Sequence, residues 1–152
     1  MAAPDDVFLA LRGLRSMAVR LRQHWENGLQ LAESLLEEPL VERVLHPALP
    51  QDPGHALWKR DYLGASGLFA VALQPVGPRA LSACFRHLRL FGIGLSWGGF
   101  ESLALPSEPT LARTVRPVPY KGPIIRIHAG LESAADLIED MRGAFRHMRA
   151  AL

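Results

Sequence analysis

Cysteine and lysine are both scarce in this chain. It has one cysteine, Cys84, and only two lysines, Lys59 and Lys121, among its 152 residues. A single cysteine excludes an internal disulfide and a zinc site built from several thiolates, and it favours a reducing compartment, so we predict a cytoplasmic protein. We also predict that Cys84 is a small core residue and not a nucleophile.

Long apolar runs are also missing. No run approaches the ~20 residues that a membrane-spanning helix needs, and the first residues lack the basic region and apolar core of a secretory signal. We therefore expect a protein without membrane contact. Apolar residues still make up 49% of the chain, which is enough for one domain with a packed core and no need of a structural metal.

A strong charge of one sign is absent too. The 17 basic and 15 acidic residues leave a net charge of +2, and the arginines alternate with acids instead of forming a basic cluster. We expect no nucleic-acid partner, because such proteins usually carry a basic stripe with aromatic stacking residues. Weak nucleic-acid binding, suggested only by the basic isoelectric point, is a distant alternative.

Helical spacing dominates the two ends of the chain. Apolar residues recur every three or four positions between residues 11 and 35, which predicts one long helix within residues 1–38. Such a helix would overhang a domain of this size, unless it bends at Gly13 or Gly28 or leans on a larger body. A second amphipathic pattern over residues 137–152, with Ser133 and Asp136 as a capping-box-like start, predicts a final helix.

The middle of the chain alternates between short β-type segments and breaks. We predict strands at 41–45, 68–73, 89–93, 100–105 and 124–128, a helix at 79–88, and loops at 46–55 and 106–122. This order indicates an α+β fold with a small, mainly antiparallel sheet and helices packed on one side. We expect a single domain over residues 1–152, in which 1–38 is a long linking helix and 39–152 is the small α+β part.

The segment 92–102, with the sequence GIGLSWGGFES, is the most informative stretch. Its four glycines indicate a tight turn or a close approach of the backbone to something else. The plainer interpretation is a glycine-rich hairpin with a half-buried tryptophan. Residues 94–98 also match the G-x-S-x-G nucleophile elbow, with Asp140 and His147 as candidate acid and base. The turn and strand expected after Ser96 leave no place for the helix that an elbow needs, so we reject a hydrolase.

Arg126 lies in the centre of an apolar strand, where alternation puts it on one face with His128, opposite Ile125 and Ile127. A guanidinium in such a place needs an anion, and its planar fork suits a carboxylate. Two partners stay open from the residues alone: an internal acid such as Glu101, or the carboxylate of a substrate. The six histidines show no metal-ligand spacing, so we expect no metal site.

Six motifs follow one another along the chain: PDDVFLALRGLR (4–15), LHPALP (45–50), WKRD (58–61), SGLF (66–69), SWGGFES (96–102) and IRIHAGLE (125–132). In this order they resemble the last third of the cystathionine β-lyases, which are pyridoxal-phosphate (PLP)-dependent enzymes of the Cys/Met-metabolism family. The tryptophan after the serine resembles the β-lyase branch more than the γ-synthase and γ-lyase branches. The resemblance covers essentially the whole chain and implies the C-terminal domain of a fold-type I PLP enzyme.

The resemblance also implies roles for three residues. Arg126 would clamp the α-carboxylate of an amino-acid thioether substrate, the backbone amide of Trp97 would help to hold the same carboxylate, and Ser96 would orient the catalytic lysine. The reaction would be the β-elimination of cystathionine to homocysteine, pyruvate and ammonia. Leu95 departs from the aromatic residue that is usual before the serine, which leaves the exact thioether open.

The family's large PLP-binding domain is absent from this chain, and with it the lysine that forms the Schiff base. Lys59 lies in a motif that does not carry that lysine in the family, and Lys121 lies in a proline-rich loop. We therefore expect no catalytic residue in this chain and no PLP bound to it alone. The resemblance further implies a homo-oligomer that needs the missing large domain or a split partner chain for activity. The alternative is a detached, non-enzymatic domain that acts as an amino-acid-binding or interaction module.

Overall fold

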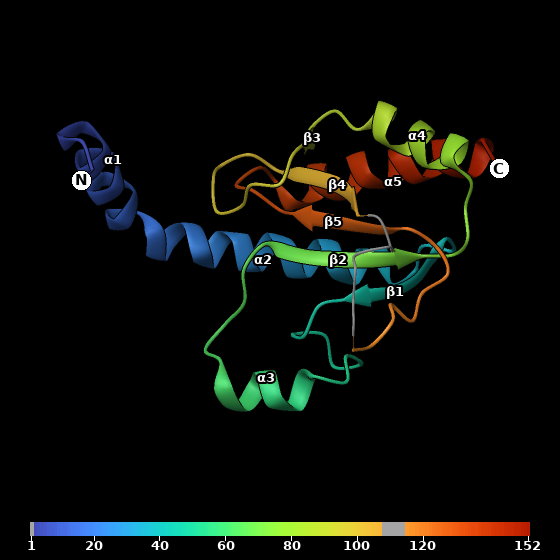
Figure 1. Cartoon of the computed structure of the whole chain (residues 1–152), viewed down its shortest axis with the longest axis horizontal. Helices are drawn as coiled ribbons and strands as arrows, with labels where there is room; N and C mark the ends of the chain where they lie inside the picture. The colour runs from blue at the N-terminus through green and yellow to red at the C-terminus, as the bar shows by residue number, and fades with distance from the viewer. Residues whose placement is uncertain (1, 108–114) are drawn as a thin grey trace.

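Five strands and five helices make up the described part of the chain, which is residues 2–107 and 115–152 of the computed structural model (Figure 1). The strands are β1 (Val41–Leu45), β2 (Leu68–Leu73), β3 (Gly92–Ile93), β4 (Leu103–Ser107) and β5 (Ile124–His128). The helices are α1 (Pro4–Arg15), α2 (Met17–Leu35), α3 (His55–Asp61), α4 (Pro78–His87) and α5 (Ala134–Ala150).

The strands form one sheet with the order β1-β2-β5-β4-β3. The pairs β1–β2, β2–β5 and β5–β4 are antiparallel, and only β3–β4 is parallel. In this register Arg126 of β5 lies directly between Ala70 of β2 and Leu105 of β4. The structure confirms the α+β class and the mainly antiparallel sheet.

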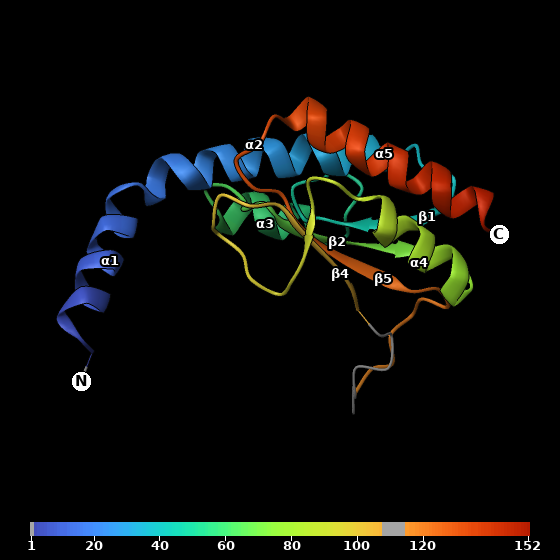
Figure 2. The same cartoon turned by 90° about the horizontal axis from the view of Figure 1, so that it is seen from above.

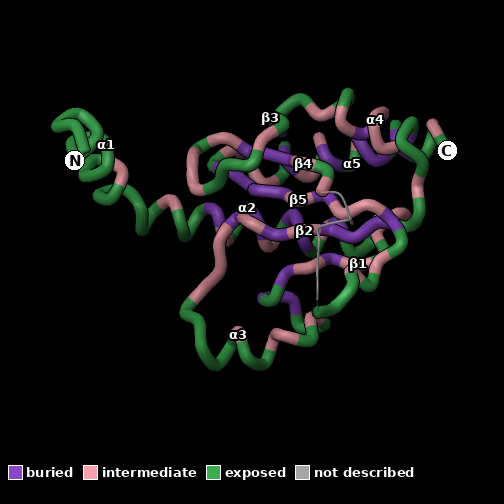
Figure 3. Tube along the Cα trace, viewed as in Figure 1, coloured by how far each residue is buried: buried purple, intermediate pink, exposed green. Residues whose placement is uncertain are grey.

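Helices α2 and α5 lie against the same face of the sheet, and α4 packs on α5 (Figure 2). Alternation along β5 explains this arrangement, because Ile125 and Ile127 are fully buried beneath the helices whereas Arg126 between them is only partly buried. The buried residues in Figure 3 accordingly follow the strands and the inner sides of α2 and α5. The largest fully buried side chains include Leu31, Leu35, Leu73, Leu137, Met141, Phe145 and Met148.

The N-terminal helical segment is divided at Ser16 into α1 and α2, where one long helix was expected. The amide and hydroxyl of Ser16 and the guanidinium of Arg20 all donate to the carbonyl of Gly13. They replace the amide of residue 17, which would bond to this carbonyl in a continuous helix. Helix α1 contains no buried residue and projects away from the sheet (Figures 1 and 2).

Two strand predictions in the glycine-rich region are corrected by the structure. The strand expected at 89–93 shrinks to β3, because the carboxylate of Asp140 accepts the amides of Arg89 and Leu90 and so removes them from a ladder. The strand expected at 100–105 begins only at Leu103. Because β3 and β4 are parallel, the hairpin interpretation of this segment is wrong.

Other local differences are smaller. Helix α3 was not predicted, because seven residues are too few to show a helical repeat and no side chain caps its start. Of the loop expected at 106–122, residues 106 and 107 belong to β4, and residues 108–114 lie outside the described residues. Within the described ranges, no helix has the length and apolar character needed to cross a membrane.

The packing of β5 against the helices predicts which isoleucine contributes most to the stability of the fold. Ile127 is 0% exposed, whereas Ile93 on β3 is 67% exposed. Ile127→Ala should lower the free energy of unfolding by about 2–5 kcal/mol, because it leaves a cavity in the core. Ile93→Ala, the same chemical change at the surface, should stay within about 0.5 kcal/mol. Urea unfolding measures both, and equal effects would contradict this description of the core.

Candidate functional site

In the described part of the sheet, the cross-strand neighbours of Arg126 carry no charge. Its cross-strand neighbours Ala70 and Leu105 carry no acid, and no ion pair of Arg126 occurs among the described residues. The expected internal alternative, a pair with Glu101, is therefore not formed in this structure. Instead, Nη1 of Arg126 donates to the carbonyl oxygen of Ser96 at 3.4 Å, a distance at the weak limit of a hydrogen bond.

The segment 94–101, which we call the bend, reaches Arg126 from the glycine-rich region. Gly98 turns the chain with φ +79°, a left-handed conformation that side-chain-bearing residues disfavour. The side chain of Trp97 is 61% exposed, and Ser96 is exposed as well. Within the described residues, the amides of Ser96 and Trp97 donate to no other group. The structure thus brings all three sequence-predicted site residues together.

Three side chains hold the bend by its glycines. From α2, Nε of Arg20 donates to the carbonyl of Gly98 at 3.3 Å, and Nε2 of His24 lies 2.9 Å from the carbonyl of Gly99. From β5, Nε2 of His128 lies 3.0 Å from the amide nitrogen of Gly98, which donates to it. Sequence reasoning missed this role of both histidines. The available signal was that His128 follows Arg126 by two residues, which places both side chains at the same end of one strand.

A second network fixes the chain where it leaves the bend. The carboxylate of Glu132 accepts the amide of Ser102 at 2.9 Å and its hydroxyl at 2.8 Å. The same hydroxyl accepts the amide of Gly130 at 2.8 Å, and Asn27 donates to the carbonyls of Gly130 and Glu132. A Cβ at Gly130 would lie 2.3 Å from the carbonyl oxygen of Phe100, so only glycine fits there. Helix α2, the bend and the segment after β5 are therefore tied together.

Burial controls the charge of the histidines around this site. His24 and His128 are each 1% exposed, and their rings meet edge to face with centroids 4.9 Å apart. Burial lowers the pKa of both imidazoles below the usual 6.5, and the positive charges of Arg20 and Arg126 act in the same direction. Both rings are consequently neutral at pH 7.

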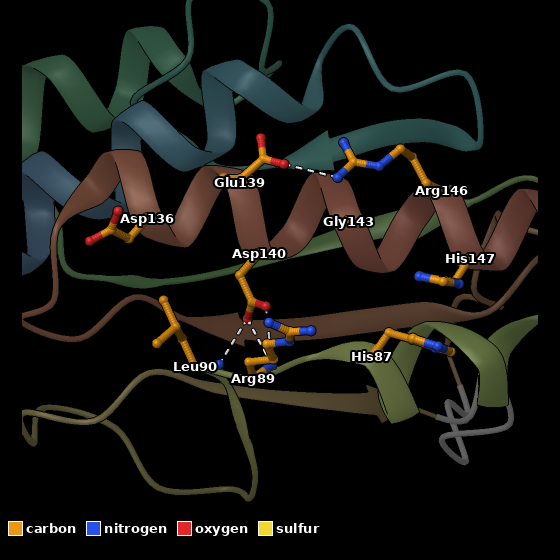
Figure 4. Close-up of a pocket in the computed structure, with 9 residues that line it drawn as sticks. All are labelled: His87, Arg89, Leu90, Asp136, Glu139, Asp140, Gly143, Arg146 and His147. Carbon is orange, nitrogen blue, oxygen red and sulfur yellow. Dashed lines mark hydrogen bonds and ion pairs between the residues drawn. The ribbon is translucent and has the colours of Figure 1, made fainter.

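The candidate acid and base of the rejected serine hydrolase lie away from Ser96. Asp140 and His147 line a groove between α4 and α5, together with His87, Arg89 and Glu139 among others (Figure 4). Asp140 accepts the amides that follow α4, and His147 stacks on His87 with centroids 3.4 Å apart. Ser96 does not line this groove. Cys84 is fully buried on α4, which raises the pKa of its thiol to about 12 and confirms its core role.

The comparison with known proteins decides the family. The family of the Cys/Met metabolism PLP-dependent enzymes has a model that matches residues 1–146. The chain belongs to this family. Its similarity extends to a Cystathionine beta-lyase of Salmonella typhimurium, with 45% identity over 149 residues that cover 95% of this chain and 38% of the relative. An L-alanine/L-glutamate racemase of Wolbachia pipientis is 41% identical over 145 residues, covering 94% of this chain and 36% of the relative.

A solved enzyme structure has the same fold over the whole of this chain. The crystal structure of the cystathionine gamma synthase from Xanthomonas oryzae pv. oryzae in complex with cystathionine matches with a TM-score of 0.87 and 35% sequence identity. The match covers 100% of this chain and 40% of that protein. The chain therefore spans well under half the length of the Cys/Met metabolism enzymes that it matches.

The described residues do not supply the lysine that a PLP site requires. Enzymes that use PLP hold it through a lysine whose amine is activated by its surroundings. Lys59 lies exposed on α3, and Lys121 lies exposed before β5. Neither side chain makes a hydrogen bond or ion pair with another described residue. The residues present therefore do not fit PLP, although the family depends on it.

The buried histidines predict that the free energy of unfolding decreases as the pH falls. Burial lowers the pKa of His24, His46 and His128 in the folded chain, whereas unfolding returns each to near 6.5. Above pH 6.5 the rings are neutral in both states and the stability is complete. Below it the unfolded chain binds more protons, so the free energy of unfolding decreases as pH falls.

Urea unfolding at several values between about pH 8 and 5 tests this prediction. The wild-type chain should lose stability steadily below pH 6.5, and His46→Asn should lose less, since one titrating group is removed. A free energy of unfolding that stays constant over this range would contradict the assignment of neutral, buried imidazoles.

Proposed function

We propose that this chain is the C-terminal part of a PLP-dependent carbon–sulfur β-lyase and that it binds the α-carboxylate of the amino-acid substrate. The observation that carries the proposal is the meeting of Arg126 with the bend. The guanidinium lies on an uncharged part of the sheet, within reach of Ser96, and no described acid neutralises it. A partly buried arginine without an acid is the usual partner of a ligand carboxylate.

Each site residue then has a separate task. The guanidinium of Arg126 gives up its weak contact with the carbonyl of Ser96 and donates two parallel N–H groups to the carboxylate, a stronger, charge-assisted pairing. The amide of Trp97, which bonds to no described residue, donates to one of the same oxygens, and the exposed indole shields the contact from water. The hydroxyl of Ser96 is exposed. It can donate a hydrogen bond to the lysine of the missing large domain or accept one from it.

The reaction is proposed from the family and from one residue. When bound in the complete enzyme, PLP would supply an acceptor for the electrons of the substrate bond that breaks, whereas the residues of this chain would hold the substrate carboxylate. Trp97 after the serine and the 45% identity with the Salmonella lyase favour β-elimination, which turns cystathionine and one water into homocysteine, pyruvate and ammonia. The thioether itself stays less defined, because Leu95 carries no aromatic ring toward the distal part of the substrate.

The exposed apolar residues support the inference that another domain covers part of this surface. Helix α1 exposes Val7, Phe8, Leu9, Leu11 and Leu14, and the region of the bend exposes Ile93, Leu95, Trp97 and Phe100. Apolar surface of this extent is normally covered by another body. We assign this cover to the large PLP-binding domain, joined through residues 1–38 to the small domain 39–152, within a cytoplasmic homo-oligomer. Catalysis then requires that domain, whether it comes from the same gene or from a split partner chain.

A titration tests the carboxylate site in the chain itself. Addition of L-cystathionine to the ¹⁵N-labelled chain should shift the amide signals of Ser96, Trp97 and Gly98. Arg126→Ala should weaken this binding by about 2 kcal/mol or more, which is ~30-fold in Kd, since a charge-assisted pair is lost. Arg142→Ala, which removes an exposed arginine of α5, is the matched control and should change nothing.

Activity tests the remainder of the proposal. The chain alone should release no pyruvate from cystathionine, and it should do so after addition of a polypeptide that carries the missing large domain and PLP. Binding of the amino acid without any activity in the mixture would instead favour the detached binding module. If the amide signals of the bend do not shift, or if they shift equally in Arg126→Ala, the assignment of the carboxylate site is wrong.

A further inference from the structure

His128 can make its contact with the bend in only one protonation state. The amide nitrogen of Gly98 lies 3.0 Å from Nε2 of His128, and an amide can only donate. Nε2 must therefore carry a lone pair, and the proton of the neutral ring lies on Nδ1. Nδ1 is itself buried and has no hydrogen-bond partner in the described part of the chain. The ring has no second arrangement that keeps the bond to Gly98.

The neighbouring histidine behaves differently. Nε2 of His24 lies 2.9 Å from the carbonyl oxygen of Gly99, which can only accept, so this nitrogen carries a proton. A second proton on His24 would go to Nδ1 and leave the contact with Gly99 intact. A second proton on His128 would go to Nε2, place two donors face to face and break the contact with Gly98. Of the two buried rings, only His128 loses its hydrogen bond to the bend when it is protonated.

The contact lies where the proposed ligand binds. Arg126 and His128 lie two residues apart on β5, and they contact Ser96 and Gly98 of the bend. These contacts lie on either side of Trp97. They fix the direction in which the backbone amide of Trp97 points. We propose that neutral His128 is a positioning residue for carboxylate binding: it holds the amide of Gly98, and its protonation removes this one of the three side-chain contacts to the bend and weakens the site. This inference rests on the proposed function.

The charged groups around His128 set the range of pH in which this happens. On β5 it faces Arg126, on α2 it faces His24, and on the bend it faces Glu101. His24 in turn faces Arg20 and Glu132. Burial and the nearby cations lower the pKa of His128 below 6.5, against the opposite effects of the Gly99 backbone and Glu101, so protonation occurs below pH 6.5 and not at neutral pH. The positive charge of a protonated His128 would instead attract the carboxylate. If this attraction dominated, binding would become tighter as the pH falls.

Binding of L-cystathionine measured from about pH 7.5 down to about pH 5 distinguishes the two trends. We expect the Kd of the wild-type chain to rise by about three- to tenfold in acid, which corresponds to one lost hydrogen bond. His128→Gln should bind nearly as well as the wild type at neutral pH, because its side-chain oxygen can replace Nε2, and its affinity should not change with pH. His128→Leu should bind weakly at both ends of the range.

His46→Asn is the matched control, since His46 is equally buried but contacts the amide of Ala48 and not the bend. It should keep the wild-type pH profile. Tighter binding of the wild type in acid, or a profile that His128→Gln does not flatten, would overturn the proposal.

A spectroscopic readout separates this inference from the proposed function. In the wild type, the ¹⁵N shift of the His128 ring should report an unprotonated Nε2 at neutral pH, and the Gly98 amide should move with the same midpoint as the ring titrates. If no carboxylate binds at any pH, the proposed function fails, and the shared midpoint alone decides whether His128 holds the bend. If the carboxylate binds while the Gly98 amide does not follow His128, the positioning role is wrong and the proposed function stands.

Discussion

The hydrogen bonds to two adjacent glycines are the constraint on which the site depends. Gly98 and Gly99 are held from α2 by Arg20 and His24 and from β5 by His128. Without these bonds the left-handed turn at Gly98 would be one of many conformations that a glycine-rich segment can adopt. With them, the backbone beside Trp97 is fixed relative to the sheet, and so relative to Arg126. The site is therefore a property of the tertiary fold and not of the bend alone.

The position of Arg126 in the sheet leaves its guanidinium partly buried and poorly paired. The core face of β5 is occupied by Ile125 and Ile127 under the helices, so Arg126 must use the other face. There its cross-strand neighbours are the uncharged Ala70 and Leu105, and the carbonyl of Ser96 offers only a weak acceptor. A guanidinium that is positioned but poorly paired is prepared for a carboxylate, because little has to be broken before the ligand binds.

Residue patterns predicted the regular parts of this structure and failed where side chains bind the backbone. Strands β1, β2 and β5 were predicted within their observed bounds, and the face of Arg126 follows from alternation along β5. The strand limits near the bend could not be predicted, since they depend on Asp140 and Glu132 binding amides from distant segments. The roles of His24 and His128 were also hidden, because each contacts a residue about 75 or 30 positions away. Arg126, Ser96 and Trp97 were found only through the family resemblance joined to the strand argument.

The most direct measurement is a crystal structure of the chain with bound L-cystathionine. Our account predicts that the α-carboxylate lies on Arg126, with both oxygens within hydrogen-bond distance of the guanidinium and one of them also on the amide of Trp97. The bond between Gly98 and His128 should remain in place. A carboxylate bound elsewhere, with Arg126 still on Ser96 or paired with an acid of this chain, would contradict the central claim.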